Sequence, residues 1–299
     1  MKKPVNRLKR SENLWGWAFI TPTLFSFLAL TAIPFVISIL LSFLDWNFFS
    51  GIEKIKWVGV ENFIDIWDDN DFIKGLQNTF VYVITIVPLS IILSLVFAFC
   101  MNGRIFGKTA LRMMFFIPYI SSIVAVGAVF KFLFREDGTV NNLLMSLGVI
   151  SEPLKWTIKK ELTKIPIILL SVWMSIGYQL ILFTAAMQNV PTTLYEAARI
   201  DGASSFKQFT KITMPMISPT IFYLVITRMM AVFKIFGSVN IFTMGSSIDS
   251  NTSVVVEIYE FAFVKYEFGP ASAMSMVLFG IILVVTAINF WGQKKWVHY

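Results

Sequence analysis

Residue types that commonly carry enzyme chemistry are scarce in this sequence. Its one cysteine, Cys100, excludes an internal disulfide framework and a cysteine-based metal cage, and its one histidine, His298, argues against a buried Ser-His-Asp triad. The segment Gly103–Thr109 is similar to a phosphate-binding loop, but it is one residue shorter than G-x-x-x-x-G-K-[ST] and follows an apolar helical stretch instead of a strand. We therefore expect a short basic loop there, and a chain without catalytic residues, metal ligands or an ATP site of its own.

The composition is that of a membrane protein. Of the 299 residues, 56% are hydrophobic and 14% are charged, whereas soluble proteins have about 45–50% and about 25%. Apolar stretches without Asp or Glu, each long enough to cross a bilayer as a helix, recur along the chain. We predict an all-α membrane protein with six transmembrane helices. They lie at roughly 15–44, 78–100, 113–134, 165–186, 219–244 and 271–292. The first is too long for a signal peptide and lacks an A-x-A cleavage site, so we expect it to be retained.

The distribution of Lys and Arg predicts the orientation. The loops of one side carry thirteen basic and three acidic residues, and those of the other side carry nine and fifteen. Basic loops of membrane proteins lie in the cytoplasm. We therefore predict that both termini are cytoplasmic, with a tail at 1–14 and a six-helix domain at 15–299. The net charge of +7 then reflects topology, and no nucleic-acid partner is expected. The basic loops are 1–14, 101–112, 187–218 and 293–299, and the acidic loops are 45–77, 135–164 and 245–270.

Two of the acidic loops have further features. The loop at 45–77 is rich in Asp, Trp and Phe, which suits either an aromatic belt at the membrane interface or a docking surface on the outer face. The loop at 135–164 predicts a short helix around Val140–Leu147 that lies along the membrane.

The longest basic loop, 187–218, has the signals of two short helices. Thr193-x-x-Glu196 is the pattern of a capping box that opens a helix just after Pro191. Gly202 can adopt a positive φ and end that helix, and Ser205-x-x-Gln208 can cap the next one. We predict a helix pair around a sharp glycine turn, either docked on a partner or lying at the membrane interface without one.

The same loop resembles a known family. The spacing E-A-A, three residues, G, nine residues, I-x-L-P is the signature of permease subunits of bacterial binding-protein-dependent ABC importers. The matching residues are Glu196, Ala197, Ala198, Gly202, Ile212 and Pro215. The chain departs at Met214, where the family usually has leucine, a swap that conserves volume. Segments at 16–22, 41–46, 58–63, 78–79 and 116–118 resemble the carbohydrate-uptake branch, most of all its first permease, the maltose and glycerol-3-phosphate type.

This resemblance implies a type I ABC importer permease fold in the bacterial cytoplasmic membrane, and a set of partners. Such a permease pairs with a second, homologous permease. Two ATPase subunits, which hold ATP and magnesium, dock below, and an extracellular solute-binding protein delivers a saccharide. No cofactor is implied for this chain. The resemblance also implies that the loop carries movement of the ATPases to the membrane helices. The residues of this coupling segment are Glu196, Ala197, Ala198, Arg199, Asp201 and Gly202.

A saccharide path needs aromatic faces and hydrogen-bonding groups inside the helical bundle. Ser171, Ser175 and Tyr178 recur at i, i+4 and i+7, which is one helical face, and Gln179 follows them. By resemblance, Tyr178 falls on a position that contacts sugar in the maltose permease, and the two serines lie one and two turns before it. The alternative is that the serines only let helices pack closely.

The fifth apolar stretch adds Arg228, Lys234 and Asn240 to the candidate path. A cation in the middle of a bilayer costs about 2.5–3.5 kcal/mol on insertion scales, and the six stretches contain no carboxylate to pair with it. A carboxylate of the partner permease or movement of the charge to the interface would relieve this cost. Because the family often has F-K-x-F around Lys234, Arg228 is the unusual residue, and it suggests an anionic, uronate-containing sugar.

Two rival functions differ from this one. A permease of the same class for glycerol-3-phosphate or a similar polar solute would share the whole architecture. An ion-coupled secondary transporter would place Asp, Glu or His near the middle of the membrane, and the apolar stretches have none.

Overall fold

The computed structural model describes residues 7–47, 49, 51–103, 106–243 and 251–294. His298, part of the segment Gly103–Thr109, and the ends of the predicted tails therefore lie outside the described residues. The chain divides into two units, 1–68 with 261–276 and 69–260 with 277–299. Each unit is described below by itself.

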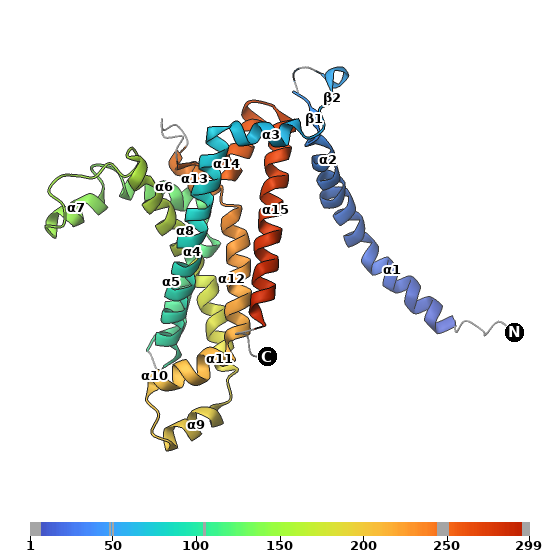
Figure 1. Ribbon diagram of the computed structural model, residues 1–299. Helices are drawn as coiled ribbons and strands as arrows, with labels where there is room; N and C mark the ends of the chain where they lie inside the picture. The colour runs from blue at the N-terminus through green and yellow to red at the C-terminus, as the bar shows by residue number, and fades with distance from the viewer. Residues whose placement is uncertain (1–6, 48, 50, 104–105, 244–250, 295–299) are drawn as a thin grey trace. The chain divides into compact units, whose positions relative to one another are not determined.

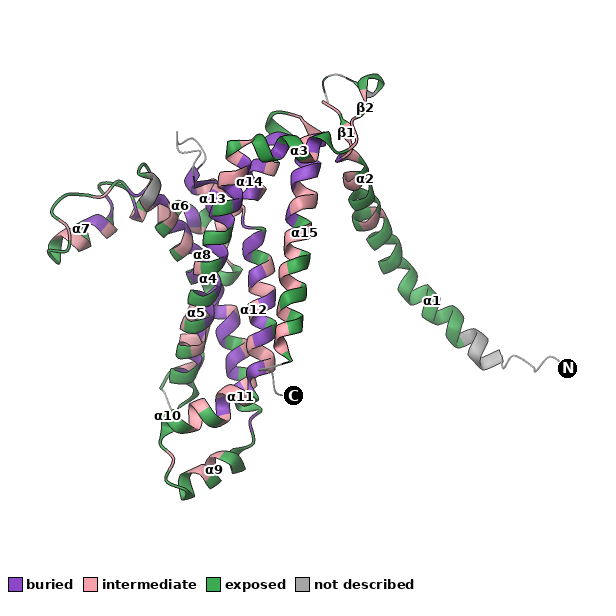
Figure 2. Cartoon of the chain, viewed as in Figure 1, coloured by how far each residue is buried: buried purple, intermediate pink, exposed green. Residues whose placement is uncertain are grey.

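The first unit begins with a long apolar helix. α1 (Arg7–Phe27), the π-helical η1 (Leu28–Ala32) and α2 (Ile33–Leu41) follow one another without a break and contain a stretch of 30 residues, Glu12–Leu41, that could cross a membrane. None of its most apolar window is buried, and Figure 2 colours most of its described residues as exposed. A helix with apolar side chains on every side needs a membrane or another protein around it.

A small hairpin, which was not predicted from the sequence, follows this helix in the otherwise helical described residues. β1 (Leu44–Asp45) pairs antiparallel with β2 (Lys56–Trp57), and the 3-10 helix η3 (Ile52–Lys54) lies between them. α3 (Glu61–Asp68) is held to the hairpin by Asn62, whose Nδ2 donates to the carbonyl oxygens of Ser42 at 3.0 Å and Leu44 at 2.9 Å. The π-helix η6 (Glu260–Val264) and the start of α15 (Phe268–Gln293) supply the rest of this unit.

The second unit is a helical bundle whose centre is the pair α4 (Asn70–Asn102) and α8 (Lys160–Gln188). α12 (Ser218–Phe233) packs on α4, and α5 (Lys108–Ile120) packs on α8 (Figure 1). The shorter helices are α6 (Ile123–Leu133), α7 (Thr139–Ser146), α9 (Thr192–Ile200), α10 (Ser205–Gln208), η4 (Phe209–Thr213), α11 (Met214–Met216), α13 (Gly237–Thr243) and α14 (Val254–Tyr259). α7 confirms the short helix predicted around Val140–Leu147.

Among the residues that the structure describes, five helices are long and apolar enough to cross a membrane, and a sixth span arises if one bent pair is counted. That pair, α5 and α6, is bent by 99°, so the prediction of one helix over 113–134 is wrong. The cause is local, because Ser121 and Ser122 both have extended backbone and the Ser121 hydroxyl donates to the Ile117 carbonyl at 2.7 Å in place of a helical bond.

The span predicted at 219–244 is also interrupted. α12 ends at Phe233, Lys234 caps its C-terminus, and α13 begins at Gly237. Lys234 therefore lies at a helix end and is exposed, whereas the sequence placed it inside a helix.

Gly177 fixes how closely α8 approaches α5. A Cβ atom at this position would overlap the backbone of Phe115 and Phe116. Backbone atoms cannot move aside as a flexible side chain can, so only glycine permits this approach.

We predict that Gly177→Ala lowers the free energy of unfolding by about 1–3 kcal/mol, the usual cost of overpacking. The apparent melting temperature of the purified protein measures the effect. Gly280→Ala in α15 is the matched control, because a Cβ there would meet nothing within 4 Å. Equal melting temperatures for the two variants would contradict the close approach of α5 and α8.

Candidate functional sites in the bundle and in the two-helix loop

A cavity in the second unit is lined by α5, the first residue of α6, α8, α12 and the start of α13. It consists of two adjoining pockets of about 320 Å³ and about 160 Å³ that share Tyr119, Ser175, Arg228 and Ala231 in their walls. Of the path residues predicted from the sequence, the cavity brings together Ser171, Ser175, Tyr178, Gln179 and Arg228. Lys234 and Asn240 are not among its lining residues.

Arg228 is positioned by α12 so that its guanidinium reaches α8. Its Nη2 donates to the main-chain oxygen of Ser171 at 2.7 Å. Its Nε is buried and has no hydrogen-bond partner among the described residues. From the sequence, no carboxylate of the apolar stretches was available to pair with Arg228. In the structure its hydrogen-bond partner is a neutral carbonyl. The positive charge therefore stays uncompensated within the described residues.

Two tyrosines, Tyr119 and Tyr178, line the cavity together with Arg228, and a third, Tyr223, contacts Tyr178. The rings of Tyr119 and Tyr178 stack with centroids 5.1 Å apart and an interplanar angle of 16°, and the hydroxyls of Tyr178 and Tyr223 lie 3.5 Å apart. Tyr119 was not predicted from the sequence as a cavity residue. It follows Pro118 and lies two residues before the extended Ser121, so the Pro-Tyr-x-Ser-Ser pattern was the available signal of a broken helix that exposes a tyrosine.

The remaining predicted path residues of α8 are more buried than the tyrosines. Ser171 and Ser238 share a hydrogen bond of 3.0 Å between their hydroxyls, which joins α8 to α13. Gln179 is only 2% exposed, and its Oε1 accepts from the Ser94 hydroxyl at 2.8 Å. These groups thus hold helices together as well as line the cavity, so the two readings of the serines made from the sequence are compatible.

One wall of the cavity is held in place by residues 251–253, the segment directly before α14. The Ser253 hydroxyl donates to the carbonyl of Ile235, a cavity residue, at 2.6 Å. From α4, Asn78 Nδ2 donates to the Thr252 carbonyl at 3.0 Å, and the Tyr82 hydroxyl donates to the Asn251 carbonyl at 2.8 Å. The break after α12 is therefore tied to α4, which fixes one side of the cavity.

The loop between α8 and α12 contains the predicted helix pair, α9 and α10. α9 ends in a Schellman motif, in which the amide of Ala203 donates to the carbonyl of Ala198 at 2.8 Å and that of Gly202 donates to Arg199 at 3.0 Å. Gly202 has φ +72°, which confirms the positive φ predicted for it. The two helices are thereby joined by a defined turn.

Both predicted capping boxes are wrong in detail. α9 begins at Thr192 with Pro191 as its N-cap, so Thr193 lies inside the first turn and its hydroxyl caps nothing. The helix begins just after Pro191, as predicted, but this is two residues earlier than a box with Thr193 as its N-cap requires. In α10 the cap is Ser204, whose hydroxyl accepts from the amide of Lys207 at 3.3 Å, one residue before the predicted Ser205.

The surface of α9 is open to a partner. Glu196, Ala197, Arg199 and Asp201 are exposed, and Ala198 is half-buried. Among the described residues, no ion pair involves the charged members of this group. Ile200 is 87% exposed and Phe206, in α10, is 74% exposed, so the turn also presents large apolar side chains.

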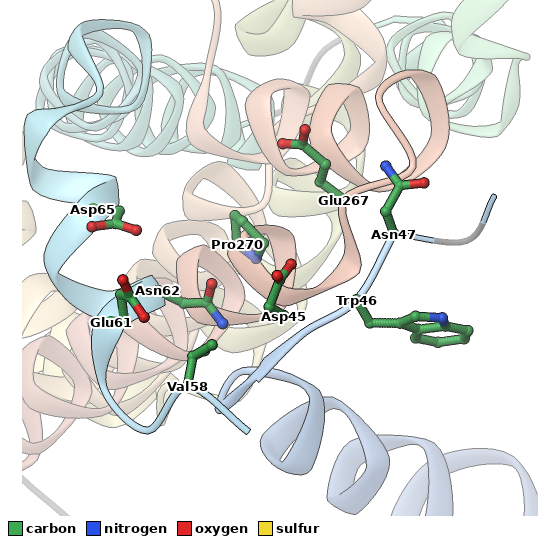
Figure 3. A pocket seen from close by; sticks show the side chains of 9 residues that line it. All are labelled: Asp45, Trp46, Asn47, Val58, Glu61, Asn62, Asp65, Glu267 and Pro270. Atoms are coloured by element: carbon green, nitrogen blue, oxygen red, sulfur yellow. The ribbon is translucent and has the colours of Figure 1, made fainter. Parts of the chain in front are cut away.

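The first unit contains a separate, acidic pocket of about 360 Å³ (Figure 3). Carboxylates of Asp45, Glu61, Asp65 and Glu267 line it, and no basic side chain is among the described residues of its wall. The indole of Trp46 stacks on Phe268, with centroids 5.2 Å apart. Both readings of the 45–77 loop, as an aromatic belt or a docking surface, are compatible with this arrangement.

The bundle of apolar helices, its polar cavity and the exposed loop suit a membrane transport subunit. The chain belongs to the family described as binding-protein-dependent transport system inner membrane component, whose model matches residues 72–297. It is thus a multi-pass protein of the cytoplasmic membrane and an ABC importer permease, which confirms the resemblance found in the sequence.

Curated relatives cover nearly the whole chain. The chain is 34% identical to the probable ABC transporter permease YesP of Bacillus subtilis, over 100% of this chain and 96% of the relative. It is 32% identical to the lactose transport system permease LacF of Rhizobium radiobacter, over 96% and 97%.

A solved structure confirms the type I ABC importer permease fold. A bacterial alginate ABC transporter in complex with an alginate pentasaccharide-bound periplasmic protein contains a chain that superposes with a TM-score of 0.84. The identity is 22%, and the match covers 98% of each chain.

We predict that Gly202→Val opens the turn between α9 and α10, because a β-branched residue at positive φ costs about 1–3 kcal/mol. Faster amide exchange over residues 192–208 measures the opening. Gly202→Asn, which tolerates the left-handed region, should exchange nearly as slowly as the wild type. Gly148→Val is a second control, since Gly148 also has positive φ but lies in another loop. Unchanged exchange in Gly202→Val would contradict the turn.

Proposed function

We propose that this chain is one of the two permeases of an ATP-driven saccharide importer. An extracellular binding protein delivers the sugar, and two ATPase subunits, which hold ATP and magnesium, drive its passage into the cytoplasm. The observation that carries the saccharide assignment is the stacked Tyr119–Tyr178 pair beside hydroxyls and one guanidinium. Relatives named for lactose, starch degradation products and multiple sugars support it.

The chemistry of the cavity suits a sugar. A pyranose has apolar C–H faces that pack on aromatic rings, and hydroxyls that exchange hydrogen bonds with groups such as Ser175 and Tyr178. Cavity hydroxyls that bond each other or the main chain can exchange those partners for sugar hydroxyls at little cost.

We assign the cargo to the acidic sugars, with a uronate as the anionic group. The basis is Arg228, a cavity cation with only a neutral carbonyl as partner. A carboxylate or a phosphate can pair with a guanidinium in two parallel hydrogen bonds. The likeness to a transporter for the acidic polysaccharide alginate supports a uronate. Relatives named for sn-glycerol-3-phosphate, 29% identical, make a phosphate ester the second candidate.

The exposed segment Glu196–Gly202 is proposed to dock on an ATPase subunit. Its unpaired charges can form charge-assisted hydrogen bonds, and the apolar Ile200 and Phe206 can fill a groove. In this arrangement the loop at 187–218 is cytoplasmic, as are the tail at 1–14 and the C-terminus. The bent pair α5–α6 counts as one crossing, and the six-helix domain covers 15–299.

We predict that Arg228→Met reduces uptake of a uronate-containing oligosaccharide about ten- to a hundredfold, the loss expected for one hydrogen-bonded charge. Uptake of a neutral oligosaccharide and of glycerol-3-phosphate is measured in the same vesicles. Lys234→Met is the control, because Lys234 lies at the end of the same helix but outside the cavity wall.

The outcomes separate the candidate partners of Arg228. Selective loss of the uronate supports the acidic sugar, and selective loss of glycerol-3-phosphate supports the phosphate ester. Equal loss for all cargoes with a lower yield of the complex indicates a carboxylate in the partner permease, because a stranded buried charge costs about 3–5 kcal/mol. That last result would remove the anionic cargo and leave the importer assignment in place.

The topology is tested by labelling single cysteines in intact cells, with Cys100 replaced by serine. We expect Ser151→Cys, in the exposed loop after α7, to react with a membrane-impermeant maleimide added outside. Ser204→Cys, at the exposed start of α10, should react only after the cells are opened. The reverse pattern would overturn the proposed orientation.

A further inference from the structure

α9 is attached to the bundle by very few contacts. None of its residues is buried, and only Tyr195 and Ala198, three residues apart and so on one face, are half-buried. Among the described residues, one hydrogen bond joins an α9 side chain to another element. It links the Tyr195 hydroxyl to the Thr213 hydroxyl at 2.8 Å.

Thr213 lies shortly before the N-terminus of α12, the helix that contains Arg228. It is the last residue of η4 and is only 4% exposed. Helical hydrogen bonding continues past it, because the amide of Ile217 donates to the Thr213 carbonyl and the amide of Ile221 donates to the Ile217 carbonyl, both at 3.0 Å. These two hydrogen bonds span the turn at Ile217, where α11 ends and α12 begins, so a movement of Thr213 passes into α12. Arg228 lies about 22 Å further along at a rise of 1.5 Å per residue.

We propose that Tyr195 is the positioning residue that couples α9 to α12, through its hydrogen bond with Thr213. This inference rests on the proposed function, in which α9 docks on an ATPase subunit. When the ATPase displaces α9, the hydroxyl pair moves Thr213 with it, and α12 shifts the cavity wall that contains Arg228. Without the pair, α9 can pivot between the extended Pro191 and the turn at Gly202 while the bundle stays in place.

The Tyr195 hydroxyl can be removed without changing the docking surface. Glu196, Ala197, Arg199 and Ile200 are exposed, whereas Tyr195 is half-buried. Tyr195→Phe keeps the ring and its packing and deletes only the bond to Thr213. The variant should therefore still assemble with the ATPase subunits, and only the transmission of movement should be impaired.

The experiment uses the full complex of both permeases, the ATPase subunits and the binding protein in vesicles. ATP hydrolysis and uptake are measured in the same vesicles. The cargo is whichever of the uronate-containing oligosaccharide, the neutral oligosaccharide and glycerol-3-phosphate the wild type imports fastest. We expect Tyr195→Phe and Thr213→Val each to lower the sugar imported per ATP hydrolysed about three- to tenfold, the effect of one lost hydrogen bond. The double variant should be no worse than either single one, because both remove the same interaction.

Two controls exclude a general structural effect. Thr213→Ser keeps the hydroxyl and should restore the wild-type ratio. Thr210→Val deletes a hydroxyl of the same helical segment that bonds only within it, to Phe206 and Lys207, and should leave the ratio unchanged.

The results distinguish this inference from the proposed function. If Tyr195→Phe keeps the wild-type ratio, or if the double variant shows the product of the two single losses, the coupling role of Tyr195 is overturned while the importer assignment stands. If the wild-type permease does not co-purify with ATPase subunits and imports none of the probes, the proposed function fails and this inference fails with it.

Discussion

The structure depends on one constraint, namely that a backbone polar group inside hydrocarbon must find a partner within the protein. The break between α5 and α6 meets it locally, through the Ser121 hydroxyl, and the breaks beside α13 meet it with side chains from neighbouring elements. The Ser253 hydroxyl donates to the Ile235 carbonyl at the break after α12, and Lys131 Nζ donates to the Ile241 carbonyl at 3.1 Å near the end of α13. Ile235 and Gly237 also line the cavity, so the breaks that cost backbone bonds are the places where the cavity opens.

The same constraint explains the unusual state of Arg228. A carbonyl of α8 satisfies one of its donors and fixes the direction of the side chain, but it does not neutralise the charge. A carboxylate at this place would form a closed ion pair, and breaking such a pair is costly. The Arg228 guanidinium is oriented by the carbonyl dipole of Ser171, so its positive charge stays available to a molecule that enters the cavity. The geometry thus favours an anion that arrives and leaves over a permanent partner within this chain.

The sequence predicted features that depend on hydropathy and on single residues with special backbone. The apolar stretches correctly predicted most of the candidate membrane spans, and Gly202 correctly predicted the turn between α9 and α10. Features set by contacts between distant residues were missed. Asn62 holds the β1–β2 hairpin through carbonyls of Ser42 and Leu44, and the 99° bend between α5 and α6 places Tyr119 in the cavity. The observed N-cap lies two residues before the predicted one in α9 and one residue before it in α10, because local patterns locate helix ends only approximately.

The loop that would meet the ATPases combines a stiff turn with a weak attachment. The Schellman bonds at Gly202 join α9 and α10 firmly, while α9 buries no side chain against the bundle. A coupling element that packed deeply would have to break that packing whenever it moved. One that touched nothing would transmit no force. A single hydroxyl pair at the base of α12, with its threonine buried and its tyrosine at the edge, meets both demands. It can carry displacement in either direction, and α12 delivers the displacement to the cavity.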